Sequence, residues 1–128
     1  MSFTPANSVA WVEIPVTDLD KGIAFYSRVF DYSLSVNDAG PNPIADIHIA
    51  DMNGGVSGHL YPGKTAIHPG TGPTIHLNVP DTLEAAAARV VEAGGAIVSD
   101  AIAIPPGRFQ YVTDPDGNSI GLFEPRKG

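Results

Sequence analysis

Glu13 and His76 are the two residues whose types and positions best suit proton chemistry. Each lies in a short segment of alternating polarity, and the two residues are 63 positions apart. A carboxylate beside an imidazole could act as a general base with its partner, or both could bind a relocated metal ion. They could equally form a buried pair that satisfies its own hydrogen bonds and closes the top of a cavity.

The same interval recurs elsewhere in the chain. Residues 13–18 (EIPVTD) correspond to residues 76–81 (HLNVPD), and Gly58 corresponds to Gly121. A constant interval across separated segments indicates a duplicated unit. The two glycines could open space above a strand, or they could let two backbones approach closely where strands cross near an internal twofold axis.

Further residues could line a cavity between the two copies. Strand alternation places Trp11 on the face of Glu13 and Thr74 on the face of His76. Aromatic side chains that converge on a cavity suit a flat or apolar ligand, although they also suit ordinary core packing. Candidates from the second half are Tyr111, Phe123 and Arg108, the last on a loop where it could bind a ligand carboxylate or phosphate or simply be exposed.

The remaining histidines are weaker candidates for metal ligands. A metal site of Glu13, His76 and either His48 or His59 would have acceptable ligand types. However, His59 alternates away from Gly58 and therefore away from the expected cavity face. We expect both histidines at the surface or in a second layer, and His68 in solvent.

The elements that must position these residues repeat in order. Residues 8–16, 32–37, 44–50 and 56–61 alternate as strands do, and Asp18 is expected to cap a helix whose apolar residues recur every three or four positions through Phe30. Residues 62–72 are rich in Pro and Gly and predict a linker. We therefore place the first module at 8–61 and the second at 73–125.

The second module repeats the pattern. A strand over 73–79 precedes a helix that Asp81 caps, with Glu84 completing a capping box, and Gly94-Gly95 ends the helix. Strands follow over 96–102, 109–113 and 119–124. Residues 114–118 (DPDGN) predict a hairpin turn, because an EF-hand would need Gly and Glu where Ser119 and Pro125 stand.

Composition narrows the function. The chain has 128 residues, a net charge of −7 and no cysteine, which predicts one soluble domain. The negative charge disfavours nucleic acids and anionic membranes as partners. With no leader-like or long apolar segment apparent, we expect a cytoplasmic protein.

The motif EIPV with Asp18, Phe25-Tyr26 and Phe30, followed by HLNV, Gly94-Gly95 and the DPDGN turn, resembles the vicinal oxygen chelate superfamily in its glyoxalase-like, two-module branch. The superfamily includes glyoxalase I, extradiol dioxygenases and bleomycin-resistance proteins. The resemblance implies an α+β fold of two tandem β-α-β-β-β modules, whose curved mixed sheet surrounds a cavity, and a homodimer.

Metal-dependent relatives place one ligand on the first strand and one on the last strand of each module. By this resemblance the four positions are Trp11, Gly58, Thr74 and Gly121. Because these residues offer no adequate set of ligand atoms, we expect no cofactor at the usual metal positions. A divalent metal at another place in the protein stays a possibility.

The leading hypothesis is a protein that binds a small organic molecule in an aromatic-lined cavity without that metal. The alternative is a metal-dependent lyase, isomerase or dioxygenase with Glu13 and His76 as displaced ligands. Whether the protein catalyses a reaction is left open. A purely scaffolding dimer is a third possibility that the cavity of this fold disfavours.

Overall fold

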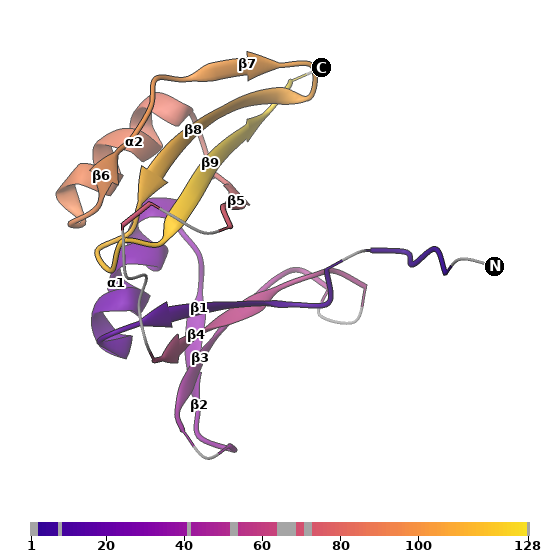
Figure 1. The fold of residues 1–128 in the computed structure, drawn as a ribbon, viewed down its shortest axis with the longest axis vertical. Coiled ribbons are helices and arrows are strands. Elements are labelled where there is room, and N and C mark those ends of the chain that lie inside the picture. The colour runs from indigo at the N-terminus through magenta and orange to yellow at the C-terminus, as the bar shows by residue number, and fades with distance from the viewer. Residues whose placement is uncertain are drawn as a thin grey trace.

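The computed structural model of the chain describes residues 3–7, 9–40, 42–51, 54–63, 69–70 and 73–127. Two helices and two mixed sheets confirm the predicted α+β class, and the β-α-β-β-β order recurs in the second half with one strand divided (Figure 1). The elements are β1 (Val12–Val16), α1 (Leu19–Phe30), β2 (Leu34–Asn37), β3 (Ile44–Ile47), β4 (Gly58–Pro62), β5 (Ile75–Asn78), α2 (Leu83–Glu92), β6 (Ala96–Ile97), β7 (Ile102–Ile104), β8 (Gly107–Thr113) and β9 (Ser119–Pro125).

Each module builds its own sheet. Sheet A has the strand order β1-β4-β3-β2, and sheet B has the order β5-β9-β8-β6, with β7 also pairing with β8. In both sheets the first and last strands of the module are parallel neighbours, and the other pairs are antiparallel. Figure 1 shows the two sheets diverging from the side on which α1 and α2 lie.

Helix α1 begins and buries its apolar face as predicted. The Asp18 side chain accepts a hydrogen bond from the Lys21 backbone N–H at 3.1 Å, which satisfies one free donor of the first turn. The helix buries four large side chains completely, namely Phe25, Tyr26, Val29 and Phe30. It ends at Asp31, whose φ of 58° is left-handed.

Helix α2 begins differently from the prediction. Its N-cap is Thr82, whose hydroxyl accepts from the Ala85 backbone N–H at 3.2 Å. Asp81 instead forms two hydrogen bonds with Arg89, at 2.8 and 2.9 Å. Glu84 pairs with Arg108 rather than closing a capping box. Both predictions for the start of this helix were wrong because Arg89, near the other end of the same helix, attracts Asp81, and Arg108 on β8 attracts Glu84.

The predicted strand over 96–102 is divided into β6 and β7. The backbone N–H groups of Val98 and Ser99 both donate to the Tyr111 carbonyl, at 2.9 and 3.2 Å. Two residues facing one partner make a bulge, which bends the strand. The Ser99 hydroxyl fixes the bend by accepting from the Tyr111 N–H at 3.0 Å. The predicted first strand is also shortened: β1 starts at Val12, and position 8 lies outside the described residues.

One apolar core joins the modules, containing residues from both helices and both sheets. The predicted turn at 114–118 reinforces it. Asp114, only 3% exposed, accepts hydrogen bonds from the Tyr26 hydroxyl at 2.8 Å and from the Asn118 amide at 2.9 Å. Asn118 also donates to the Pro15 carbonyl at 2.8 Å. A turn of the second module is thereby fixed to β1 and α1 of the first.

The predicted linker over 62–72 lies mostly outside the described residues, so its extent stays a prediction. Neither described helix is long and apolar enough to cross a membrane.

Candidate ligand-binding site

Each sheet has one face against the helices and one face that is open. In sheet A, Ile14, Ala45 and Leu60 are buried on the helix face. Glu13 is directly opposite His59, so the two side chains share the open face. In sheet B, Ile120 and Leu122 are buried on the helix face, while His76 is opposite Gly121 on the open face.

The pairing of β1 with β4 corrects the expected faces of Gly58 and His59. Glu13 and His59 are 46 positions apart, whereas the equivalent pair, His76 and Gly121, is separated by 45. The first module thus has one additional residue between its parallel strands, and a shift of one residue reverses the face. Gly58 therefore lies with Val12 on the helix face, and His59 reaches the open face.

Glu13 and His76 are not brought together. They belong to different sheets, and Glu13 instead pairs with His59, whose Nε2 lies 2.9 Å from a Glu13 carboxylate oxygen. The side chain of His59 is 18% exposed and that of Glu13 is 55% exposed. The Glu13–His76 pair, one of the possibilities raised from the sequence, is therefore not formed within one chain.

Three aromatic rings gather on the open face of sheet B. The centroid of His76 lies 5.3 Å from that of Phe109 and 5.9 Å from that of Tyr111, and Phe109 and Tyr111 are 5.3 Å apart. The contacts involving Phe109 have the edge-to-face geometry that aromatic pairs prefer. Phe123 is opposite Phe109 on the same face. We call His76, Phe109, Tyr111 and Phe123 the ring cluster.

Gly121 makes the ring cluster possible. A Cβ added at this glycine would overlap the His76 ring, with Nδ1 as the nearest atom. The imidazole therefore lies over the backbone of β9 in space that only a glycine leaves free. The expectation that missing side chains open space is met at Gly121. At Gly58 an added Cβ would instead overlap the backbone oxygen of Val12, so that glycine permits close strand pairing.

The four positions aligned with metal ligands are not gathered at one place. Trp11 precedes β1 and is 66% exposed, and Gly58 faces the helix side. Thr74 precedes β5 and shares a 2.5 Å hydrogen bond with the Ser119 hydroxyl. Gly121 lies beneath His76. Only the two positions in the second module, Thr74 and Gly121, lie beside the ring cluster.

The residues at these positions do not suit a divalent metal ion. Two are glycines, Trp11 carries no ligand atom, and the Thr74 hydroxyl already has a partner. Within the described part of the chain, no group of three or more His, Asp or Glu side chains is arranged to hold a metal. The expectation of a metal-free protein stays a prediction.

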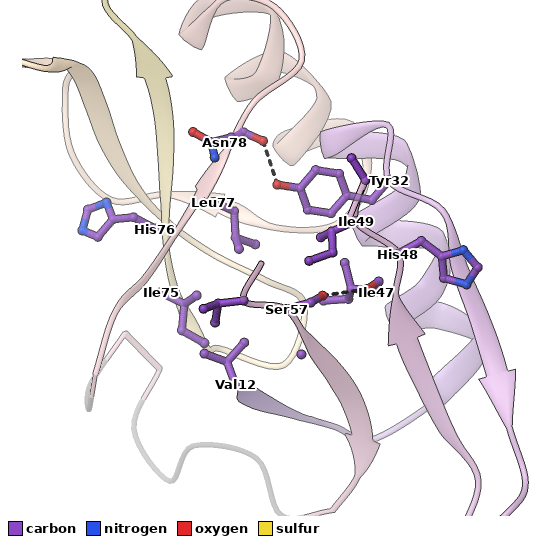
Figure 2. Close-up of a pocket in the computed structure, with 13 residues that line it drawn as sticks. Val12, Tyr32, Ile47, His48, Ile49, Ser57, Ile75, His76, Leu77 and Asn78 are labelled. Atoms are coloured by element: carbon purple, nitrogen blue, oxygen red, sulfur yellow. Dashed lines mark hydrogen bonds between the residues drawn. The ribbon is translucent and has the colours of Figure 1, made fainter. Parts of the chain in front are cut away.

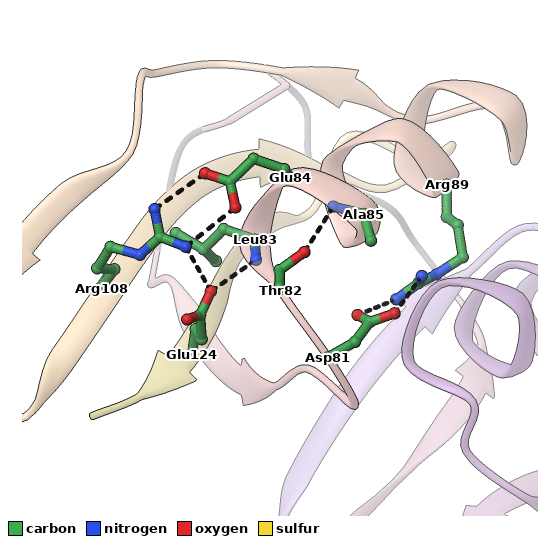
Figure 3. A network of polar contacts seen from close by, with 8 residues as sticks. All are labelled: Asp81, Thr82, Leu83, Glu84, Ala85, Arg89, Arg108 and Glu124. Carbon is green, nitrogen blue, oxygen red and sulfur yellow. Dashed lines mark hydrogen bonds and ion pairs between the residues drawn. The ribbon is translucent and has the colours of Figure 1, made fainter. Parts of the chain in front are cut away.

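Arg108 is held by carboxylates rather than extended toward a ligand. Its guanidinium contacts Glu84 at 2.9 Å and Glu124 at 2.6 Å (Figure 3). Glu124 also accepts from the Leu83 N–H at 2.8 Å, so the three side chains attach β8 and β9 to the start of α2. Hydrogen bonding to Arg108 lowers the pKa of Glu84 to about 2. A ligand anion would have to displace a carboxylate here.

A separate apolar pocket of about 470 Å³ lies between the modules. Tyr32 closes one end by donating to the Asn78 carbonyl at 2.9 Å, and Ser57 donates to the Ile47 carbonyl at 2.6 Å. Figure 2 shows His48 and His76 directed outward, so aliphatic side chains dominate the interior. These are chiefly Val12, Ile47, Ile49, Val56, Ile75 and Leu77. The cavity between the modules is therefore not lined by the expected aromatic residues.

Two site residues were underrated by sequence reasoning. His59 was placed away from the open face, and only the pairing of β1 with β4 reveals the additional residue that reverses it. Phe109 was not named among the candidate residues, although it alternates with Tyr111 along β8, which was a usable signal. His48 was expected outside the site, and it bonds to the Ser35 hydroxyl.

Two mixed sheets, each with parallel first and last strands, define a glyoxalase-like protein. The chain belongs to the Glyoxalase/Bleomycin resistance protein/Dioxygenase superfamily, which it matches over residues 8–122. It is 27% identical over 123 residues to a glyoxylase-like domain-containing protein from Didymella fabae, covering 91% of this chain and 92% of that protein.

Solved structures agree on the fold. A glyoxalase/bleomycin resistance protein from Albidiferax ferrireducens T118 superposes with a TM-score of 0.72 at 18% identity, over 94% of this chain and all of the other. TnmS3, an antibiotic binding protein from Streptomyces sp. CB03234, superposes with a TM-score of 0.64 at 26% identity, over 97% of this chain and all of that protein.

Proposed function

We propose that this protein binds a planar small organic molecule against the ring cluster on the open face of sheet B. The observation that carries the proposal is the arrangement of His76, Phe109 and Tyr111 around space that Gly121 leaves free. Rings that packed only as core would be buried, whereas Phe109 and Tyr111 are half-buried and His76 is exposed. Partly exposed rings with fixed mutual geometry suit stacking on a flat ligand.

The antibiotic-binding neighbour supports binding as a role for this fold without a stated reaction. Catalysis by Glu13 and His76 of the same chain, or a lyase, isomerase or dioxygenase reaction at a metal that these two side chains share, is disfavoured because they lie on different sheets. Binding is therefore the function that the geometry favours.

We further propose that the site is completed in a homodimer. Sheets A and B diverge within one chain, so none of the described strands of sheet A lies opposite the sheet that carries the ring cluster (Figure 1). A second copy could place its sheet A over sheet B of the first and enclose the ligand. Light scattering coupled to size exclusion should give twice the mass of the 13.3 kDa chain. A monomer at micromolar concentration would contradict this arrangement.

The binding proposal is tested with a matched pair of ligands. 2-Naphthol is planar, and decahydro-2-naphthol has the same carbon skeleton and hydroxyl without aromatic rings. Calorimetry should show that 2-naphthol binds more tightly, and Tyr111→Leu and Phe109→Leu should each weaken it roughly three- to tenfold, because ring contacts contribute about 0.5–1.5 kcal/mol.

Two variants serve as controls for that measurement. Phe3→Leu removes an exposed ring that lies outside both sheets, and Val56→Phe fills part of the apolar pocket. Neither should change the affinity for 2-naphthol by more than about twofold. Equal affinity of the wild-type protein for the two ligands, or a larger loss in Val56→Phe than in Tyr111→Leu, would refute the ring cluster as the site.

A further inference from the structure

We propose that the apolar pocket between the modules is a second binding site, which holds a neutral molecule with an aliphatic chain of about eight to twelve carbons. The site does not depend on the ring cluster, because it lies on the opposite face of both sheets. The observation that carries the proposal is a space of about 470 Å³ with aliphatic walls, whose two hydroxyl groups already have hydrogen-bond partners.

The pocket is an extension of the apolar core rather than part of an open face. Ile75 and Leu77 of β5 pair with residues of β9 that are buried on the helix face of sheet B, so they share that face. Val12 of β1 lies on the helix face of sheet A. The ring of His76, between Ile75 and Leu77, points the other way (Figure 2). A second copy laid over the open faces would therefore not cover these walls.

One chain builds the walls of the pocket. Sheet A contributes the start of β1, the end of β3 and the start of β4, and sheet B contributes β5. Figure 2 shows Leu77 and Ile49 directed into the space between the modules. The hydrogen bond from Tyr32 to the Asn78 carbonyl closes one end. Because both modules of the same chain supply the walls, the pocket is complete without a partner.

The lining offers little to a charged or polar ligand. None of the described residues that line it is an aspartate, glutamate, lysine or arginine, and the rings of His48 and His76 are directed outward (Figure 2). The hydroxyls of Tyr32 and Ser57 already donate to backbone carbonyls, at 2.9 and 2.6 Å. A polar group in the interior would lose water without gaining a partner. The ligand that fits is therefore neutral and apolar over most of its length.

The volume sets the length of the chain. An apolar cavity of about 150 Å³ holds benzene, so a space about three times as large has room for up to roughly eighteen carbon atoms. Part of this space is open to solvent, since Val56 at its edge is 39% exposed. We expect the enclosed part to hold roughly half to two-thirds of that number. A flexible chain also follows branched aliphatic walls more closely than a flat ring does.

1-Octanol and 1,8-octanediol form a matched pair of probes, because the diol has the same chain with a second hydroxyl at its far end. Titrations followed by the methyl resonances of the labelled protein give both affinities. We expect 1-octanol to bind at least about fivefold more tightly, since a hydroxyl buried without a partner costs about 1 kcal/mol or more. Binding to the folded state alone should also raise the melting temperature.

Val56→Phe should weaken 1-octanol binding at least about fourfold, because even one displaced methylene forfeits about 0.8 kcal/mol. Val91→Phe is the matched control: Val91 is an exposed valine on α2, outside the lining of the pocket. Tyr111→Leu separates this site from the ring cluster. Both of these variants should keep the affinity for 1-octanol within about twofold of wild type, as expected for independent sites.

The wild-type protein provides a check that needs no variant. Isotope-filtered nuclear Overhauser spectra should show contacts from the 1-octanol chain to the methyl groups of Ile75 and Leu77. The proposal would be overturned by contacts to other methyl groups only, by the absence of saturable binding, or by equal affinity for the diol. Release of single chains from a dimer by 1-octanol would also overturn it, because a second copy would then be the occupant of the pocket.

Discussion

Replacing Tyr26 by Phe should test the polar contact that joins the two modules. The Tyr26 ring is fully buried, with Phe25 at 5.0 Å and Phe30 at 6.0 Å between ring centroids. The substitution keeps these contacts and removes only the hydroxyl, which donates to Asp114 at 2.8 Å. Any loss of stability therefore reports this one hydrogen bond and the carboxylate that it leaves behind.

The expected loss is about 1.5–3 kcal/mol, the range for a hydrogen bond to a charged group. Asp114 retains hydrogen bonds from the Asn118 side chain and from the backbone N–H groups of residues 116 and 118, so its carboxylate is only partly deprived of donors. This places the loss toward the lower part of that range. The melting temperature should fall by roughly 3–10 °C for a domain of this length.

Tyr32→Phe is the matched control. Its hydroxyl also connects the modules, by donating to the Asn78 carbonyl at 2.9 Å, but the acceptor is neutral and the ring is half-buried. Its expected cost is about 0.5–1.5 kcal/mol. Urea denaturation at about pH 8 measures both variants, and an unchanged m value would show that the unfolded ensemble is not altered. A loss in Tyr26→Phe no larger than that in Tyr32→Phe would refute the reasoning.

Three further predictions follow from the same contacts. Gly121→Ala should displace the His76 ring and weaken 2-naphthol binding at least threefold, as measured by calorimetry. The loss of stability in urea should be less than about 1 kcal/mol, because an exposed side chain can move aside. Retained affinity would contradict the role of Gly121. Burial raises the pKa of Asp114, so the proton that it binds stabilises the folded state. This proton-linked contribution is complete below the ordinary aspartate pKa of about 3.9 and is lost as the pH rises through the higher folded value. The free energy of unfolding of wild type minus that of Asp114→Asn should therefore fall as the pH rises above about 4, and a difference that does not change with pH would contradict this. Arg108→Met should change the affinity for 2-naphthol by no more than about twofold, because the Arg108 guanidinium is already bound by Glu84 and Glu124. Loss of these ion pairs should reduce the dependence of the melting temperature on salt. A large loss of affinity would show that Arg108 belongs to the binding site.

Local signals predicted most of the fold. Asp18 caps α1 because its side chain reaches a backbone N–H three residues later, a contact that needs no other part of the chain. The turn at 114–118 forms for a similarly local reason, with Gly117 in a left-handed conformation at a φ of 86°. Where a residue beyond the first helical turn competes, local reasoning fails, as at Asp81, which bonds to Arg89, and at Glu84, which bonds to Arg108.

The site was predicted less completely than the fold. Gly121 and His76 were recognised as neighbours of a ligand position, and Tyr111 and Phe123 lie beside them on β8 and β9. Their convergence depends on alternation within strands, which the sequence displays. His59 was not recognised as the partner of Glu13 because the interval between the parallel strands differs by one residue between the modules. The sequence does not show where a long connection contains the additional residue.

The amino-acid sequence by itself determined the repeated β-α-β-β-β unit, the apolar face of α1 and the caps and turns that depend on neighbouring residues. Only the tertiary structure decided that His59, and not His76, lies beside Glu13, and that Arg108 is held against α2. The physical reason is that periodicity and capping act over a few residues, whereas the pairing of parallel strands and the choice of ionic partners are settled by packing between segments far apart in the chain.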